Sequence, residues 1–169
     1  HIQQAPEKTW AVRGPPETRP NVVTSIHLEP DTLEAHIGKL YAKYKQAEEV
    51  ETRHEMYRTE DAEVILVGYG IVSRVLRSTV DQLRERGVRG GLFRPVTLWP
   101  FPSRALLQQV KNARMVQVVE LSTGMMVEDV RLTIEGRVPV EFYGRAGGNV
   151  PSAEEVRDHV LQLVAVPVG

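Results

Sequence analysis

The sequence predicts a three-layer α/β/α fold around a mostly parallel sheet of about five strands. Short apolar runs rich in β-branched residues recur along residues 61–169, and the run at 64–67 is the clearest. Apolar residues with helical spacing follow each run, usually after a glycine or a proline. Four successive strand–helix units predict right-handed crossovers, and therefore helices on both faces of the sheet.

The first unit begins at Val64–Val67, a run expected of a strand covered on both faces. It ends at Gly68-Tyr69-Gly70, and a helix is expected directly afterwards because Val72, Val75, Leu76, Val80 and Leu83 recur at helical spacing. Gly87 is placed to end this helix in a left-handed conformation.

Three more units follow. Strands are predicted around residues 88–96 and over residues 115–121, each leading into a helix. A fourth strand contains Pro139, which lacks a backbone donor and therefore predicts a sheet edge or a strand start. Ser152 with Glu155 three residues later is a capping-box pattern, so the last helix is expected to begin there.

The first third of the chain predicts a different organisation. Residues 1–30 are rich in proline and predict an extended linker arm, and residues 59–169 predict the α/β domain. Between them a linking amphipathic helix is expected over residues 31–58, capped by Asp31 with Glu34. Its apolar stripe, which includes Tyr41 and Tyr44, must cover either the chain's own core or a partner chain, and both alternatives stay open.

Composition excludes several classes of function. A formal net charge of -1 over 169 residues argues against nucleic acid as a partner, and no apolar run is long enough to predict membrane insertion. Because cysteine is absent, the chain has no disulfide, no thiolate ligand for an iron–sulfur cluster and no cysteine nucleophile. The sequence starts at His1 without a signal-peptide pattern, so we expect a cytoplasmic piece of a longer protein.

No catalytic or metal-binding pattern is present. The five histidines show no pair at metal-ligand spacing, and no serine stands in a G-x-S-x-G context. Two loops are candidates for anion contact: Gly68-Tyr69-Gly70 with Arg74, because they open a helix, and the loop that begins with Arg145. A structural tight turn is the alternative for the first loop, since Ser73 stands where the third glycine of a dinucleotide-binding motif would be.

The loop at residues 97–102 holds two large aromatic side chains between prolines. Trp99 and Phe101 suit an interface with a partner, and the alternative is a lid over the domain's own core. Together with Tyr41 and Tyr44, they are the candidate interface residues of the chain.

Four segments, residues 61–75, 91–102, 118–131 and 142–156, resemble in order and spacing the C-terminal part of the thiamine-domain-bearing subunit of 2-oxoacid:ferredoxin oxidoreductases. The 2-oxoisovalerate enzymes are the most similar, and the 2-oxoglutarate enzymes are the other candidate. Family members commonly read Glu-x-Asn-x-Gly-Gln-Met in the third segment. This chain departs from that pattern with Ser122 and Met125, so a polar role for the amide pair is not expected.

The resemblance implies a fold similar to the transketolase C-terminal domain, in a complex that decarboxylates a 2-oxoacid oxidatively, forms an acyl-coenzyme A and reduces ferredoxin. Thiamine diphosphate with Mg²⁺ and the [4Fe-4S] centre would lie on thiamine-diphosphate-binding and ferredoxin-like parts, and none on this chain. The chain alone is then expected to be an inactive assembly domain, and pairing with a second copy stays open. Two alternatives remain: a stand-alone nucleotide- or coenzyme-binding domain, and the C-terminal domain of another transketolase-like 2-oxoacid dehydrogenase.

Overall fold

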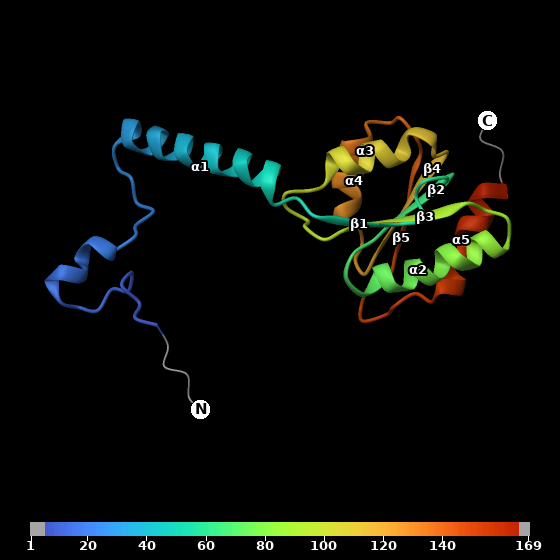
Figure 1. Cartoon of the computed structure of the whole chain (residues 1–169), viewed down its shortest axis with the longest axis horizontal. Coiled ribbons are helices and arrows are strands. Elements are labelled where there is room, and N and C mark those ends of the chain that lie inside the picture. Colours follow the sequence, from blue (N-terminus) through green and yellow to red (C-terminus); the bar gives the residue numbers. More distant parts are fainter. Residues whose placement is uncertain (1–5, 166–169) are drawn as a thin grey trace, which may run out of the picture. The chain divides into compact units, whose positions relative to one another are not determined.

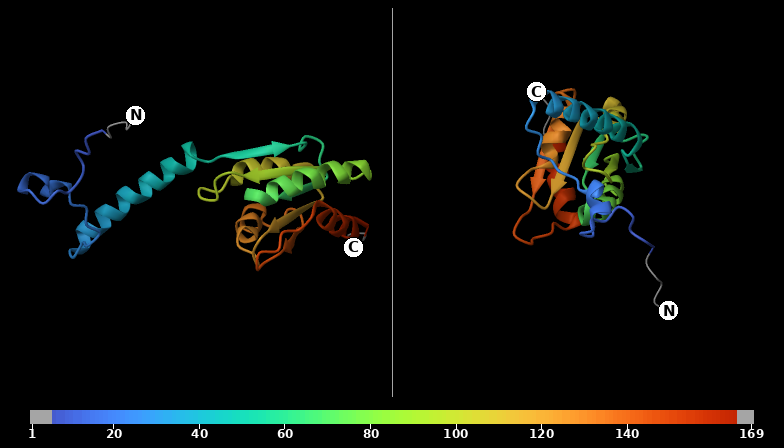
Figure 2. Two further views of the ribbon diagram at one scale, coloured as in Figure 1. Left: turned by 90° about the horizontal axis from the view of Figure 1, so that it is seen from below. Right: turned by 90° about the vertical axis from the view of Figure 1, so that its left-hand side faces the viewer.

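The computed structural model describes residues 6–165 and contains a five-stranded sheet in the order β1-β3-β2-β4-β5. Four neighbouring strands run parallel, and β1 pairs antiparallel with β3 along the edge of the sheet (Figure 2). The mostly parallel five-stranded sheet predicted from the sequence is therefore confirmed. The strands are β1 (His54–Tyr57), β2 (Val64–Val67), β3 (Gly90–Pro95), β4 (Met115–Glu120) and β5 (Val140–Gly144).

Helices cover both faces of the sheet (Figure 1). α2 (Gly70–Glu85) and α5 (Ala153–Ala165) pack together on one face, and α3 (Ser103–Gln109) and α4 (Met126–Ile134) lie on the other. These layers confirm the predicted α/β/α architecture. The remaining helices are α1 (Pro30–Val50) and two short 3-10 helices, η1 (Pro16–Asn21) and η2 (Val110–Asn112). Within residues 6–165, no helix combines the length and the apolar content that a bilayer crossing requires.

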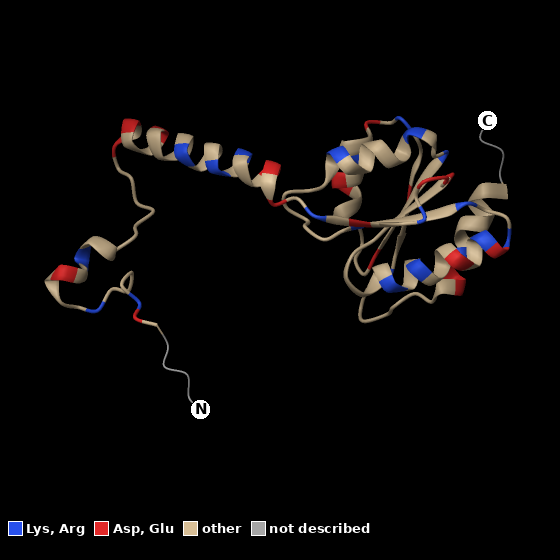
Figure 3. Ribbon diagram, in the orientation of Figure 1, with Lys and Arg blue, Asp and Glu red and all other residues tan. Residues whose placement is uncertain are grey.

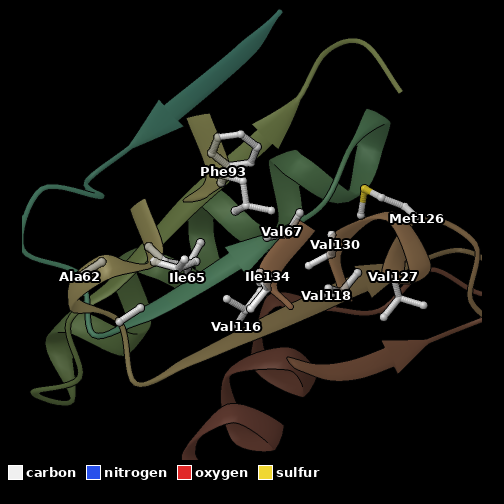
Figure 4. Close-up of a cluster of buried hydrophobic side chains, with 13 residues drawn as sticks. Ala62, Ile65, Val67, Phe93, Val116, Val118, Met126, Val127, Val130 and Ile134 are labelled. Carbon is white, nitrogen blue, oxygen red and sulfur yellow. The ribbon is translucent and has the colours of Figure 1, made fainter. Parts of the chain in front are cut away.

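The central strand β2 explains why two buried clusters form. All four of its residues are buried, and successive side chains of a strand point to opposite faces. Val64 and Leu66 therefore join the cluster under α2 and α5, whereas Ile65 and Val67 join the cluster under α3 and α4. In Figure 4, Val67 and Val118 of the sheet lie beside Val130 of α4 in this second cluster.

Several element boundaries follow the sequence signals. Gly87 and Gly136, which each follow the C-cap residue of α2 and α4, have φ angles of +81° and +74°. At the start of α5, the Glu155 N–H donates to the Ser152 hydroxyl at 3.1 Å, and the Ser152 N–H donates to the Glu155 carboxylate at 2.7 Å. This reciprocal pair confirms the predicted capping box. β5, which begins just after Pro139, lies at the edge of the sheet as expected.

The predicted linking helix differs from the structure at both ends. It begins at Pro30, so Asp31 lies inside the first turn and does not cap the helix; proline fits the first helical position because no donor is needed there. It ends at Val50 instead of residue 58, and residues 54–57 form β1. Strand β1 was missed because its four residues show no apolar alternation, and only pairing with β3 defines it.

Contacts along the chain divide it into two compact units between Lys43 and Tyr44. This boundary falls inside α1 and differs from the divisions predicted after residues 30 and 58. Within the first unit, the side-chain amide of Asn21, the last residue of η1, donates to the carbonyl oxygens of Thr9 and Ala11 at 2.9 and 3.1 Å. The predicted arm therefore contains a short ordered turn.

Candidate functional site

The loops that follow β2, β3, β4 and β5 leave the sheet at the carboxyl ends of its parallel strands. In open α/β sheets, ligands and partners bind at this edge. The first loop is built on close packing at Gly68, where an added Cβ would lie 2.6 Å from Leu76 Cδ1 and 2.9 Å from Val72 Cγ1. Gly68 therefore lets the start of α2 approach the end of β2 closely.

The first turn of α2 has no side-chain cap. Tyr69 occupies the cap position without a capping hydrogen bond, and its ring packs against the buried cluster under α3 and α4. Gly70 has a φ of +56°, and the Ser73 hydroxyl donates back to its carbonyl oxygen at 2.7 Å. Arg74 is exposed one turn into the helix. The predicted candidates Gly68, Tyr69, Gly70 and Arg74 thus lie together at the start of one helix.

Arg145 lies away from this group, after the edge strand β5, and β4 separates that strand from β2. One Nη of Arg145 lies 3.4 Å from the Glu155 carboxylate, and its backbone N–H donates to the Glu120 carbonyl at 3.0 Å. The side chain therefore already has a carboxylate partner. The two predicted anion-contact loops do not form one site.

A buried carboxylate organises the third loop. Glu120 is the last residue of β4 and is fully buried. Its carboxylate accepts from the backbone N–H groups of Met125, Met126 and Val127, the last two at 3.0 and 2.9 Å. These are donors of the first turn of α4, so Glu120 neutralises the positive end of that helix from within the fold.

Ser122 takes part in the same arrangement. Its hydroxyl donates to the Glu120 carboxylate at 3.2 Å and accepts from the Gly124 N–H at 3.1 Å. Gly144 lies against this loop, because a Cβ at that position would be 2.5 Å from the Ser122 carbonyl oxygen. Ser122, the first departure from the family pattern, therefore supplies a hydroxyl that fixes the turn. Met125, the second departure, has its side chain 71% exposed.

The two aromatic residues of the second loop have different surroundings. Phe101 is half-buried and packs against the chain's own cluster under α3 and α4. Trp99 is 60% exposed and makes an edge-on contact with Tyr44, with 5.4 Å between the ring centroids. The peptide bond between Trp99 and Pro100 is cis. Phe101 thus contacts the chain's own core, and Trp99 keeps most of its ring accessible.

Exposed apolar side chains gather in the four strand-end loops and the first turn of α2. Each of the four loops contributes at least one such side chain, and after β2 it is Ile71 in the first turn of α2. They are Ile71, Val96, Leu98, Trp99, Leu121, Met125 and Val150. Sequence reasoning selected only Trp99 among them, although isolated apolar residues between glycines and polar residues were a usable signal. What sets these side chains apart from other exposed apolar residues is their position at the edge of the sheet where this class of fold binds ligands.

Arg84 anchors the opposite end of α2. Arg84 donates to the Asp61 carboxylate and to the carbonyl oxygens of Arg58 and Gly90, the last two at 2.8 Å each. The hydrogen bond from Arg84 holds the pKa of Asp61 below its usual value. Residues 6–165 contain no cluster of three or more histidine, aspartate or glutamate side chains that could hold a metal ion.

Comparisons with known proteins identify the family of this chain. The sequence profile described as "Pyruvate:ferredoxin oxidoreductase core domain II" matches residues 62–156. The chain is 43% identical over 162 residues to the ketoisovalerate oxidoreductase subunit VorB of Methanothermobacter marburgensis. The aligned residues cover 96% of this chain and 46% of that protein. The chain thus spans about half the length of that curated relative.

Solved structures give the same fold. A 2-oxoglutarate:ferredoxin oxidoreductase from Magnetococcus marinus, with 2-oxoglutarate, coenzyme A and succinyl-CoA bound, matches with a TM-score of 0.69 at 21% identity. The match covers 80% of this chain and 24% of that one. A split-gene transketolase, described as an inactive tetramer of four beta subunits, matches with a TM-score of 0.56 at 17% identity. This match covers 65% of this chain and 40% of the transketolase chain. The transketolase-like fold predicted from the sequence is confirmed.

Proposed function

Because the chain belongs to the pyruvate:ferredoxin oxidoreductase core domain II family, we propose that it is the assembly domain of an oxidoreductase subunit acting on 2-oxoisovalerate. The name of the ketoisovalerate subunit supports this substrate, since the similarity extends over 96% of the chain and so includes α1 and the arm as well as the core domain. The reaction would decarboxylate the 2-oxoacid oxidatively, form an acyl-coenzyme A and pass electrons to ferredoxin.

The uncovered apolar side chains at the strand ends support the assembly role. Ile71 is 58% exposed and Met125 is 71% exposed, although both stand at the edge where this class of sheet meets its partners. Burying such side chains against another surface stabilises an assembly by about 1 kcal/mol or more per side chain. The other subunits, thiamine-diphosphate-binding and ferredoxin-like, are the proposed partners.

Two features of this chain argue against a metal centre on it. Thiolate ligands for a [4Fe-4S] cluster cannot come from a chain without cysteine. The buried carboxylate of Glu120, which could otherwise serve a cation, is occupied by three backbone N–H groups. We therefore assign the cluster to other parts of the complex, and we propose the same for thiamine diphosphate with Mg²⁺ and for coenzyme A, because the family resemblance implies it. A cytoplasmic location remains a prediction.

The experiment uses the complete oxidoreductase that contains this chain. We expect Ile71→Lys with Met125→Lys to lower copurification of the other subunits and to lower 2-oxoisovalerate-dependent ferredoxin reduction together. Met56→Lys is the matched control, because Met56 is also exposed but lies in β1, away from the strand-end loops. Unchanged copurification in the double variant would refute the assembly role, and a faster rate with 2-oxoglutarate or pyruvate would refute the substrate.

A second candidate function is anion contact by a coenzyme at the start of α2. It is favoured by the lack of a side-chain cap there and by exposed Arg74. Calorimetry of the chain with coenzyme A, NAD and thiamine diphosphate tests it. Binding that is lost in Arg74→Ala would support this candidate, and no detectable heat at millimolar ligand would remove it.

A further inference from the structure

A groove of about 1000 Å³ lies beside α3 and α4, and all of its lining residues belong to the second unit. Its walls come from the last turn of α1, the start of β1, the loop at residues 97–102, α3 and α4. Large apolar side chains line it, and Leu132 of α4 is 77% exposed there. These apolar residues are Trp99, Pro100, Phe101, Leu107 and Leu132.

The loop that forms one wall of the groove is held by hydrogen bonds. The Thr97 hydroxyl accepts from the Arg53 backbone N–H at 3.0 Å and donates to the Pro100 carbonyl oxygen at 2.9 Å. At the opposite wall, the hydroxyls of Ser103 and Thr133 lie 2.9 Å apart and join α3 to α4. The groove is therefore formed before a partner binds, which lowers the entropic cost of binding.

The rim of the groove is acidic. Four carboxylates line it against a single arginine, and they belong to Glu48, Glu49, Asp129 and Glu135. Lys45 pairs with Glu48, and Arg137 pairs with Glu135. Within residues 6–165, neither Glu49 nor Asp129 has an ion pair, so both charges are free to meet a cation. Figure 3 shows acidic residues at the C-terminal end of α1 and on α4.

Trp99 adds a second reason to expect positive charge on a partner. Its side chain is 60% exposed, and the face of a tryptophan ring attracts the cations of lysine and arginine. Long basic side chains also have apolar stems, which cover apolar surface while their charged ends reach carboxylates. The groove therefore favours apolar groups and positive charge on the same partner.

We propose that the groove binds a short segment of another subunit of the oxidoreductase, in which apolar side chains are flanked by lysine or arginine. This inference rests on the proposed function, because that function supplies the other subunits. The volume of the groove corresponds to about two turns of an α-helix with its side chains, so about seven residues of a partner fill it. Contact with Leu132 and Trp99 buries apolar surface, and the carboxylates select against acidic segments.

A photoreactive amino acid at position 132 of this chain, in the complete oxidoreductase, identifies the occupant. Illumination should join the chain to one other subunit, and mass spectrometry should find lysine or arginine beside apolar residues in the cross-linked peptide. Because Leu132 is so exposed, this replacement should not disturb folding. The control carries the same amino acid at Glu85, which is exposed on α2 across the sheet, and should give no cross-link to that segment.

A charge exchange tests the rim. Glu49→Lys with Asp129→Lys should raise the apparent dissociation constant of the cross-linked subunit about tenfold at low salt, and less at high salt. Glu85→Lys with Glu141→Lys makes the same change of charge at exposed positions outside the groove and should leave that constant unchanged. Changing the basic residues of the cross-linked segment to glutamate should restore binding to the reversed groove. Circular dichroism and thermal unfolding check that each variant is folded.

Several results would overturn the proposal. They are a cross-link from position 132 only to a second copy of this chain, no cross-link in the intact complex, and a cross-linked segment without basic residues. A reversed groove that binds like the wild type would do the same. A cross-link in a complex that tolerates Ile71→Lys with Met125→Lys would support the groove and refute assembly at the strand ends, so the two proposals can fail separately.

Discussion

Helices α2 and α4 both begin at the carboxyl-end edge of the sheet, but the free backbone N–H groups of their first turns have different acceptors. In α4, the Glu120 carboxylate accepts three backbone N–H groups and brings a negative charge to the positive end of the helix. In α2, no side chain caps the first turn, and Gly70 with its positive φ makes the entry. The anion at α4 is supplied by the protein, whereas the start of α2 is left to solvent or to a ligand.

This difference shows where the edge is rigid. The loop before α4 is held by Glu120, by Ser122 and by close packing against Gly144. That loop therefore presents exposed Leu121 and Met125 on a fixed backbone. A preordered apolar surface loses less conformational entropy when a partner binds, which favours assembly at this loop.

Replacing Glu120 should have the largest effect on stability. Glu120→Ala leaves three backbone donors at the start of α4 without an acceptor, so we expect a loss of about 3 kcal/mol in the free energy of unfolding. Urea unfolding followed by circular dichroism measures it. Glu128→Ala, at an exposed position in the first turn of the same helix, is the control and should cost less than about 0.5 kcal/mol. Equal losses in the two variants would contradict the capping role.

The two glycines at the start of α2 should differ in the same assay. Gly68→Ala brings a methyl group against Leu76 and Val72, and we expect a loss of about 2 kcal/mol. Gly70→Ala meets open space and only adds the cost of a positive φ, about 1 kcal/mol. The reverse order would show that backbone strain, and not packing, limits this turn.

Helix α5 provides an intermediate case, because a neutral hydroxyl caps it. Ser152→Ala removes the acceptor of the Glu155 N–H, and we expect a loss of about 1 kcal/mol. Since Thr also carries a capping hydroxyl, Ser152→Thr should recover most of that loss. If threonine recovered nothing, the hydroxyl would not be the stabilising group.

The smallest effect is expected at Asp61, which is exposed. Because the pKa of Asp61 is lowered in the folded state, its bond with Arg84 stabilises the fold above the ordinary carboxyl pKa of about 3.9. That contribution is lost as the pH falls through the lowered value. The urea midpoints of wild type and Asp61→Asn should therefore differ at neutral pH and converge in acid. A difference that persists in strong acid would refute the assignment.

The strands and helices of the core could be predicted because their signals are local. Four buried residues in β2, glycines at 87 and 136, and the Ser152–Glu155 capping box each carry their own evidence. Strand β1 could not be predicted, since its register with β3 is a long-range pairing. The helix start at Pro30 was missed because Asp31 and Glu34 imitate a capping box inside the first turn.

The candidate site was harder to predict than the fold. The turn at Gly68–Gly70 was visible as a motif, but the role of Glu120 depends on a chain reversal that brings its carboxylate to residues 125–127. A usable signal was present, because an acidic residue ends a mostly apolar strand and precedes Ser122 and Gly124. Whether Trp99 or Phe101 is exposed is decided by packing that residue type does not specify.

The short connection between α1 and β1 also offers a cleavage point. Arg53 is exposed there, immediately before the first strand, so trypsin could cut after it without removing any strand of the sheet. The product would keep both buried clusters and all four strand-end loops but would lack α1. Limited digestion of the folded chain would thus separate, in one preparation, the helix from the proposed assembly surface.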